Sequence, residues 1–183
     1  IEFVFTNDKS VFSQREVWRD TNWFSNALRA AMREDPDIVM IWEMRDRETV
    51  EAALNLAETW HLVISTLHTS SAVQTVTRLL SFFPLDSQNW VRDKLADSLQ
   101  WVLSQRLIPR KDWSWRIWIY ELMIINTWIK NQIRMWNLNQ IQSSIETWSK
   151  DWMITMKAFA ENLYNQGLVR EEDYANYFVE DAE

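Results

Sequence analysis

Runs of apolar residues in the first half of the chain predict buried strands separated by helices. Residues 38–41 form a continuous β-prone apolar run after the helix-breaking segment Asp35-Pro36-Asp37, as expected of a strand buried on both faces of a parallel sheet. Residues 61–68 form a second such run. Between them, residues 47–59 carry apolar side chains at helical spacing, so the strand–helix–strand order predicts an α/β fold.

The N-terminal residues are also predicted to form strands. Residues 1–5 and 11–14 are strand-like and are separated by a turn at 7–10. A helix is expected to begin at the capping cluster Asp20-Thr21-Asn22 and to continue to Arg33. Because the chain begins inside a strand-like run and without methionine, we expect it to be a fragment of a longer protein.

The patterning changes from mixed to purely helical near residue 125. Helices are expected over 72–80 and 87–104, followed by a hairpin whose strands, 107–109 and 117–123, flank a polar loop. Four helical segments follow, at 127–135, 138–147, 153–166 and 170–179. We therefore predict two parts, an α/β core over 1–124 and a small all-helical subdomain over 125–183.

A cluster of charged residues follows the first buried strand. Glu43, Arg45 and Asp46 come shortly after residues 38–41. Open α/β sheets bind their ligands at the carboxyl ends of their strands, so Glu43 is predicted to be an acid at the ligand edge of the sheet. The alternative is a surface turn that carries charges. For Asp46 we favour a turn or a helix cap over a metal ligand.

Composition limits the classes of function that the chain can have. Its 183 residues carry a formal net charge of −7, which argues against nonspecific nucleic-acid binding because that function needs a basic surface. Zero cysteines exclude a disulfide framework and a cysteine zinc site, and two histidines supply little of a metal site. No apolar run approaches the roughly 18–20 residues of a membrane span, and no signal peptide is visible.

The chain holds 13 tryptophans but a single glycine. Average glycine usage is about 7%. Several tryptophans stand in turns or beside helix ends, where glycine is expected: Trp60, Trp113, Trp115, Trp148 and Trp152. Our hypothesis is that many of these residues are glycine in the native protein, encoded by UGA codons that some bacterial lineages read as glycine. The alternative is a protein that is truly rich in tryptophan.

Several longer segments resemble one family of motor proteins. The segments are Gln14-Arg15-Glu16-Val17-Trp18, residues 27–37, Trp42-Glu43-Met44-Arg45-Asp46, residues 57–63 and Thr66-Leu67-His68-Thr69. They are similar to the secretion-type ATPases of type IV pili, and the chain as a whole more closely resembles the retraction ATPases, the PilT family. The family has glycine where this chain has Trp18, Trp42, Trp60 and Trp152, in agreement with the recoding hypothesis.

The resemblance implies a RecA-like P-loop NTPase core in a hexameric motor that hydrolyses ATP with Mg²⁺. Glu43 falls at the family's Walker B position, where a carboxylate helps to hold the Mg²⁺ shell and the attacking water. Glu2 falls at the last glutamate of the family's acidic box and is implied to be the general base; the alternative is a strand glutamate without a catalytic role. His61 and His68 match the His box, with His68 nearest the ATP phosphates, to which an imidazole can donate a hydrogen bond. A structural role is the alternative for His61.

A C-terminal motif matches the family in part. Asn131, Ile133 and Arg134 match a motif associated with pilus retraction, from which Lys130 and Gln132 depart. The family's extension motors carry a four-cysteine zinc insert. Its absence here, together with the short polar loop, favours the retraction branch.

Three arginines are further candidates for the site. Arg33, Arg45 and Arg78 are potential contacts to the ATP phosphates or to a neighbouring subunit. The alternative for each is a surface or intersubunit salt bridge, which contributes little individually.

The chain contains no G-x-x-x-x-G-K-[ST] P-loop, even when every tryptophan is replaced by glycine. The family has this motif upstream, so the chain corresponds to about the C-terminal half of such a protein, and we expect it to hydrolyse no ATP by itself. The resemblance implies a cytoplasmic homo-hexamer at the inner face of the cell membrane. It would act on an inner-membrane pilus platform protein, with no direct membrane insertion and no nucleic-acid partner.

Two other functions remain open at this point. One is a non-catalytic ring subunit or an accessory protein of a pilus or type II secretion system, working through its interfaces. The other is a DNA-translocating relative of RecA, which the acidic net charge disfavours.

Overall fold

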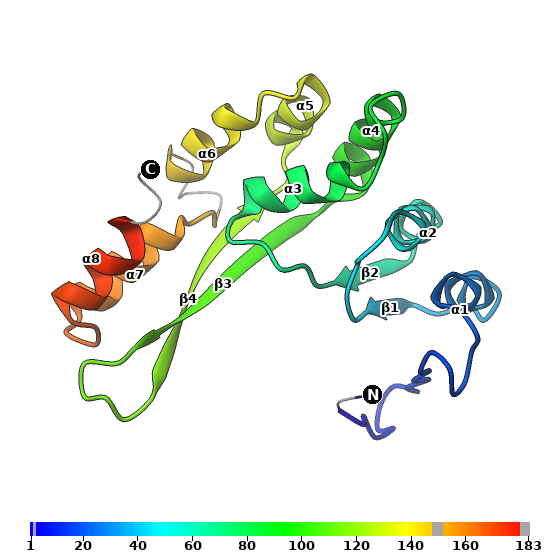
Figure 1. Cartoon of the computed structure of the whole chain (residues 1–183), viewed down its shortest axis with the longest axis horizontal. Coiled ribbons are helices and arrows are strands. Elements are labelled where there is room, and N and C mark those ends of the chain that lie inside the picture. Colours follow the sequence, from blue (N-terminus) through cyan, green and yellow to red (C-terminus); the bar gives the residue numbers. More distant parts are fainter. Residues whose placement is uncertain (2, 148–151, 180–183) are drawn as a thin grey trace. The chain divides into compact units, whose positions relative to one another are not determined.

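The computed structural model describes residues 1, 3–147 and 152–179. Contacts within the chain divide it into two compact units, Ile1–Leu67 and His68–Glu183, whose elements are labelled in Figure 1. The predicted boundary between 124 and 125 falls inside the second unit, and it stays a prediction. No helix in the described part of the chain is long and apolar enough to cross a membrane.

The first unit is built on a two-stranded parallel sheet. Strand β1, Ile38–Ile41, pairs with β2, Leu62–Ser65, in the register Ile38 to Leu62 through Ile41 to Ser65. Helix α2, Arg47–Glu58, connects the two strands, and α1, Phe24–Ala31, packs against α2. The predicted strand–helix–strand unit is therefore confirmed.

The core of this unit lies on one face of the sheet. Ile41 packs with Leu28 of α1 and with Leu56 of α2 in a buried cluster. Ile38 and Met40 point to the other face and are exposed. The expectation that β1 is buried on both faces is thus wrong for the unit as it stands, because α1 and α2 supply apolar cover to one side only.

The N-terminal segment does not form the strands expected at 1–5 and 11–14. From residue 3 to residue 16 the backbone is irregular. The side-chain amide of Gln14 joins the two segments instead. Its oxygen accepts a hydrogen bond from the Phe5 N–H at 2.8 Å, and its nitrogen donates to the Phe3 carbonyl at 2.7 Å. A side chain has taken the place of a strand ladder. The helix cap expected at 20–22 is also wrong, because α1 begins after Trp23 without a side-chain cap.

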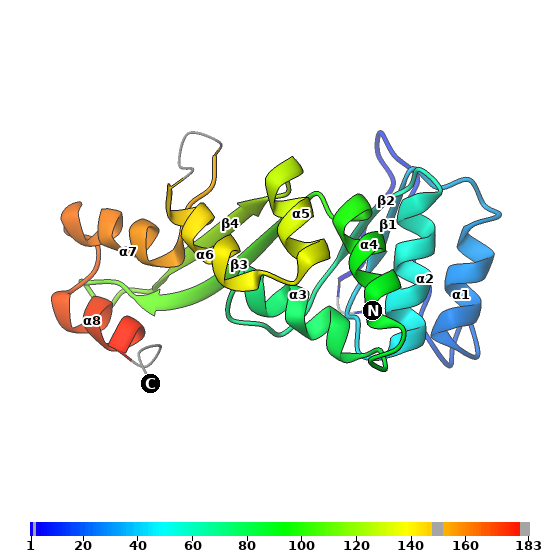
Figure 2. The same ribbon diagram turned by 90° about the horizontal axis from the view of Figure 1, so that it is seen from above.

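The second unit consists of one β-hairpin and six helices within its described residues. The elements are α3 Ala72–Ser81, α4 Gln88–Ser98, β3 Trp101–Pro109, β4 Arg116–Ile124, α5 Thr127–Met135, α6 Leu138–Thr147, α7 Met156–Asn165 and α8 Glu171–Val179. Figure 2 shows helices α3 and α6 lying beside the hairpin. The expected hairpin and the four C-terminal helices are confirmed, although α7 starts later than residue 153.

One predicted helix ends earlier than expected. Leu99 has an extended backbone and β3 begins at Trp101, whereas the helical pattern was expected to continue to 104. The β3 residues pair antiparallel with β4 along their whole length, from Trp101 with Ile124 to Pro109 with Arg116. The ladder satisfies backbone groups that a continued helix would have satisfied locally.

Helices cover one face of the hairpin. Helix α3 packs against both strands and α7 packs against β4. A buried cluster joins Ile108 and Ile119 of the hairpin to Met156, Ala160 and Leu163 of α7. The hairpin thereby holds both the start of the unit, at α3, and its C-terminal helices.

Five tryptophans have a left-handed backbone conformation. Among the described residues, φ is positive at Trp18, Trp60, Trp113, Trp136 and Trp152, and otherwise at Asp35 and Gly167. Each left-handed residue with a Cβ costs about 1–2 kcal/mol. Five such positions cost on the order of 5–10 kcal/mol, which is comparable to the roughly 5–15 kcal/mol that stabilises a whole domain. The backbone therefore favours glycine at these five positions. Trp148 lies outside the described residues.

The ends of three helices show the same preference. At the end of α2 the His61 N–H donates to the Leu56 carbonyl across Trp60, and at the end of α5 the Asn137 N–H donates to the Gln132 carbonyl across Trp136. The same hydrogen bond closes α7 across Gly167, from the Leu168 N–H to the Leu163 carbonyl. This is the Schellman motif, whose left-handed position is usually glycine. Trp60 and Trp136 thus occupy the position that Gly167 occupies in α7.

Candidate functional site

The carboxyl ends of β1 and β2 are tied together at Thr66. The Thr66 hydroxyl donates to the Trp42 carbonyl, and the Thr66 carbonyl accepts a hydrogen bond from the Met44 N–H at 3.3 Å. Glu43 lies between these two anchored residues. The first unit therefore holds the predicted acid at the edge where parallel sheets bind ligands.

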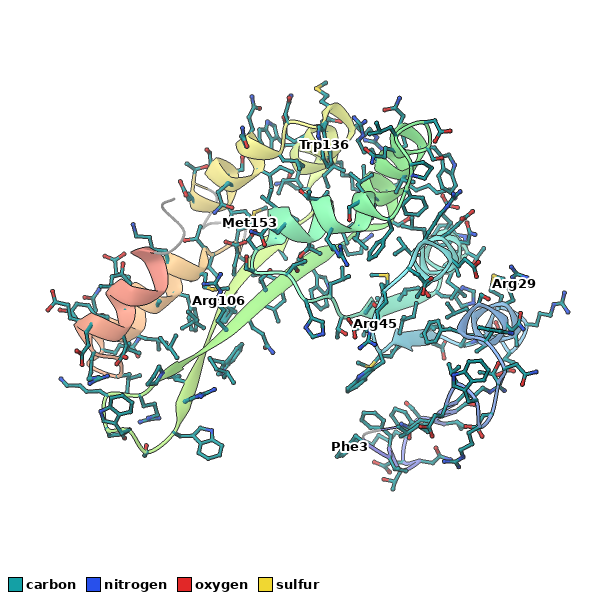
Figure 3. All side chains as sticks on the ribbon, viewed as in Figure 1. Phe3, Arg29, Arg45, Arg106, Trp136 and Met153 are labelled. Atoms are coloured by element: carbon teal, nitrogen blue, oxygen red, sulfur yellow. The ribbon has the colours of Figure 1, made fainter. Side chains whose placement is uncertain are left out.

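The Glu43 side chain is half-buried and faces a cation. It is 17% exposed, and its Oε2 accepts a hydrogen bond of 2.6 Å from Nε of Arg45, whose other guanidinium nitrogen lies 2.5 Å away. This hydrogen bond and the charge of Glu43 raise the pKa of Arg45 above its ordinary value. Figure 3 labels Arg45 near β1. Arg45 was a candidate for a phosphate contact, a subunit contact or a salt bridge, and the structure shows a salt bridge with Glu43.

Asp46 is a helix cap, as favoured by its place in the sequence. Its carboxylate accepts a hydrogen bond of 2.8 Å from the Thr49 N–H in the first turn of α2. The cap fixes the direction in which the chain leaves the Glu43 edge.

His61 lies at the amino ends of the strands, whereas Glu43 lies at their carboxyl ends. His61 precedes β2, whereas Glu43 follows the parallel strand β1, so four residues of about 3.3 Å each separate the two ends. The Nδ1 of His61 is 3.1 Å from the Leu56 carbonyl and 2.9 Å from Oγ1 of Thr59, at the end of α2. The structure thus gives His61 a role at a helix end and does not bring it to Glu43.

His68 begins the second unit, in a loop fastened to α3. Ser71 caps the helix by accepting a hydrogen bond from the Gln74 N–H at 3.2 Å. The hydroxyls of Thr69 and Thr75 are 2.8 Å apart, and the Thr75 hydroxyl donates to the Ser71 carbonyl at 2.9 Å. The His68 side chain is exposed at the start of this tied loop.

Arg78 lies at the other end of α3 from the His68 loop. It lies in the last turn of α3, and its guanidinium stacks over the ring of Phe82 at 4.6 Å. Six residues of helix rise, about 9 Å, separate it from Ala72 at the start of α3. Its predicted contact with nucleotide stays a prediction, as does the role of Arg33 in α1's C-terminal flank.

The partial C-terminal motif divides by environment on α5. Ile133 is fully buried, whereas Asn131 is exposed. Gln132 is buried, and among the described residues its Oε1 has no hydrogen-bond partner. Arg134 donates a hydrogen bond to Asp97 and lies 3.7 Å from Asp93, both on α4. The motif therefore joins α5 to α4 through its arginine. Trp136, labelled in Figure 3, follows the last residue of α5.

The two remaining predicted assignments are the general base Glu2 and the Mg²⁺ ligand. Glu2 lies outside the described residues. The described residues contain no group of three acidic or histidine side chains able to hold a metal ion, so Glu43 stands alone as the predicted Mg²⁺ ligand.

The sequence analysis assigns no role to three residues whose contacts the structure shows. Thr66 ties the two strand ends together, and Ser65 beside it has a buried hydroxyl without a hydrogen-bond partner in the described structure. Glu121 of β4 accepts a hydrogen bond at the start of α3. For Glu121 the sequence does offer a signal, because this glutamate stands within the apolar pattern of β4. No local signal marks the partners of Thr66 or of Glu121, because they lie 24 and 49 residues away.

Comparisons with known proteins agree with these features. Residues 13–117 match the family described as Type II/IV secretion system protein. The chain is 42% identical over 172 residues to a twitching motility protein of Neisseria gonorrhoeae, covering 94% of this chain and 46% of that protein. It is 45% identical over 173 residues to the type IV pilus retraction ATPase PilT of Pseudomonas aeruginosa, covering 94% and 50%.

A solved structure shares the fold. The crystal structure of the pilus retraction motor PilT with bound ADP superposes with a TM-score of 0.86 at 48% sequence identity, covering 95% of this chain and 49% of that one. The chain thus spans about half the length of the curated relatives it matches. The predicted α/β class, the C-terminal part of a RecA-like P-loop NTPase, is confirmed at the level of the fold.

Proposed function

Because the chain belongs to the type II/IV secretion system protein family, we propose that it forms part of a hexameric ATPase that drives the retraction of type IV pili. One observation carries the proposal: similarity to a pilus retraction ATPase extends over 94% of the chain at 45% identity. The position of Glu43 at the carboxyl end of β1 supports it, because this is where P-loop ATPases keep an acidic residue.

Glu43 fits a place beside Mg²⁺ and the attacking water. Proteins bind Mg²⁺ at nucleotide sites through one or two carboxylates, with phosphate oxygens and waters as the other ligands, so one half-buried carboxylate is sufficient. When bound, Mg²⁺ neutralises charge that develops on the phosphates. Arg45 holds one oxygen of Glu43 at 2.6 Å and thereby orients the carboxylate.

The reaction is hydrolysis of ATP by in-line displacement. The water oxygen forms a bond to the γ-phosphorus while the bond to the bridging oxygen breaks, giving ADP and phosphate. Glu2 is the proposed base that takes the proton of the water. His68 donates a hydrogen bond to a γ-phosphate oxygen, which is lost when phosphate leaves. We assign this contact to His68 alone, because Nδ1 of His61 is engaged at the end of α2.

The proposed setting follows from the family. The parent protein would act as a homo-hexamer in the cytoplasm, at the inner face of the cell membrane. There it would bind ATP and Mg²⁺ and act on an inner-membrane pilus platform protein. It would neither insert into the membrane nor bind nucleic acid.

The test is ATP hydrolysis by the purified full-length parent and its Glu43→Gln variant. We expect the variant to retain nucleotide binding and to lose about 10²–10⁴-fold in kcat, the range of a positioned acid or base. Glu48→Gln, an exposed glutamate in the first turn of α2, is the matched control and should hydrolyse ATP normally. Unchanged turnover in Glu43→Gln would remove Glu43 from this role. No turnover by the wild-type parent would contradict the motor function.

A further inference from the structure

Glu121 is a buried carboxylate in the middle of β4. Its side chain is 4% exposed and shares a strand face with Ile119 and Met123, both of which are fully buried. Directly opposite on β3 lies Ser104, which is also buried and whose hydroxyl has no hydrogen-bond partner in the described structure. Burial of a carboxylate is unfavourable unless it is hydrogen-bonded, so Glu121 needs a partner here.

That partner is the first backbone N–H of α3. Oε1 of Glu121 accepts a hydrogen bond of 2.8 Å from the Ala72 N–H, and Ala72 is fully buried. The first N–H groups of a helix have no acceptor within the helix, and a negative charge is favourable at its positive end. Glu121 thus anchors the start of α3 to the hairpin, 49 residues away in sequence.

The same helix start carries the loop of His68. Local hydrogen bonds fasten this loop to α3, through Ser71 with Gln74 and through Thr69 with Thr75. These bonds fix the position of the loop relative to α3, but they do not fix it relative to the β3–β4 hairpin. The Glu121 hydrogen bond adds a link from the junction of loop and helix to β4.

We propose that Glu121 is a positioning residue that acts through His68. By fixing the N-terminus of α3 on the hairpin, it sets the place from which His68 donates its hydrogen bond to the ATP phosphates. This inference rests on the proposed function. Because the Ala72 N–H already donates to Glu121, the start of α3 does not offer that group to an anion, and recognition depends on the His68 side chain.

A double-mutant cycle on the full-length parent tests the coupling. Glu121→Ala and His68→Ala are made singly and together, and kcat and KM for ATP are measured. We expect Glu121→Ala to lower kcat about tenfold or more, because small displacements of a catalytic contact have effects of up to about 100-fold. KM should stay within about twofold. In the His68→Ala background the same change should alter kcat less than about twofold, since coupled residues are not additive.

Two further variants separate positioning from general damage. Glu121→Gln keeps an oxygen that can accept the Ala72 N–H, and it should recover most of kcat. Ser104→Ala changes a buried neighbour on the same face and should leave kcat unchanged. If Glu121→Ala does not fold, Glu121→Asp, which withdraws the carboxylate by one methylene, takes its place in the cycle.

The outcomes separate the inference from its premise. Equal losses of kcat from the Glu121 change in both backgrounds, no rescue by Glu121→Gln, or an equal loss in Ser104→Ala would overturn the positioning role while leaving the ATPase function intact. Normal turnover by His68→Ala would remove the phosphate contact itself, and the inference with it. An inactive wild-type parent would refute the proposed function directly.

Discussion

The backbone N–H of His61 donates a hydrogen bond of 3.4 Å to the carbonyl of Leu56, and Trp60, which turns the chain between them, has a φ of 71°. We predict that Trp60→Gly stabilises the protein by about 1–2 kcal/mol, because glycine removes the cost of the left-handed conformation. The Trp60 side chain is 99% exposed, so its loss forfeits little burial. Thermal unfolding should show a Tm about 2–4 °C higher for each kcal/mol.

The matched control is Trp90→Gly. Trp90 lies within helix α4, at a position with ordinary helical backbone. There, glycine should lower stability by about 1 kcal/mol relative to a good helix former. A lower Tm for both variants would contradict the conclusion that the turn at Trp60 favours glycine.

Mass spectrometry of the protein from its native host tests the recoding hypothesis. Peptides that contain Trp60, Trp136 and Trp152 are predicted to carry glycine at these positions, because all three have a left-handed backbone. Peptides spanning Gly167 serve as the reference within the same digest. Tryptophan at Trp60 and Trp152 would refute the hypothesis.

The ion pair between Arg134 and Asp97 is predicted to couple α5 to α4 modestly. The Arg134 side chain is 35% exposed, and exposed pairs contribute about 0.2–1 kcal/mol. A double-mutant cycle of Arg134→Ala and Asp97→Ala, measured by urea unfolding, should give a coupling free energy in that range that falls with added salt. Asp93, at 3.7 Å, is the control and should couple more weakly with Arg134. Equal coupling to both aspartates would contradict the assignment.

The 183-residue chain alone is predicted to hydrolyse no ATP. It contains no P-loop motif, and the backbone N–H groups and lysine of that motif bind the phosphates in ATPases of this class. Phosphate release should match a protein-free blank, whereas the full-length parent should turn over. Measurable turnover by the chain alone would show that another element binds the phosphates.

Local sequence rules succeed where each interaction stays within a few residues. The apolar run of β1, the helical spacing of α2 and the cap at Asp46 could be predicted, because the groups that satisfy them are neighbours in the chain. The position of Glu43 at a strand end could also be predicted, because Glu43 follows the apolar run 38–41 closely in the sequence.

The same rules fail where the local sequence fits both a helix and a strand. Val91, Leu95, Leu99 and Val102 continue a helical spacing, but Val102 belongs to β3, where it pairs with Met123 of β4. The backbone groups near residue 101 can bond either within a helix or across a ladder. The ladder forms because β4 is available on the other arm of the hairpin, which no window of local sequence contains.

By itself, the sequence determined the α/β class, the order of most elements, the strand end that carries Glu43 and the family. These depend on periodicity, capping and motif spacing, which are properties of adjacent residues. The tertiary structure alone decided that His61 serves a helix end, that Gln14 replaces a strand ladder and that Glu121 anchors the start of α3. The Glu121 contact joins residues 49 positions apart, and the Gln14 contacts join two segments across an irregular loop. The contact of His61 depends on a helix end whose geometry only the folded backbone defines.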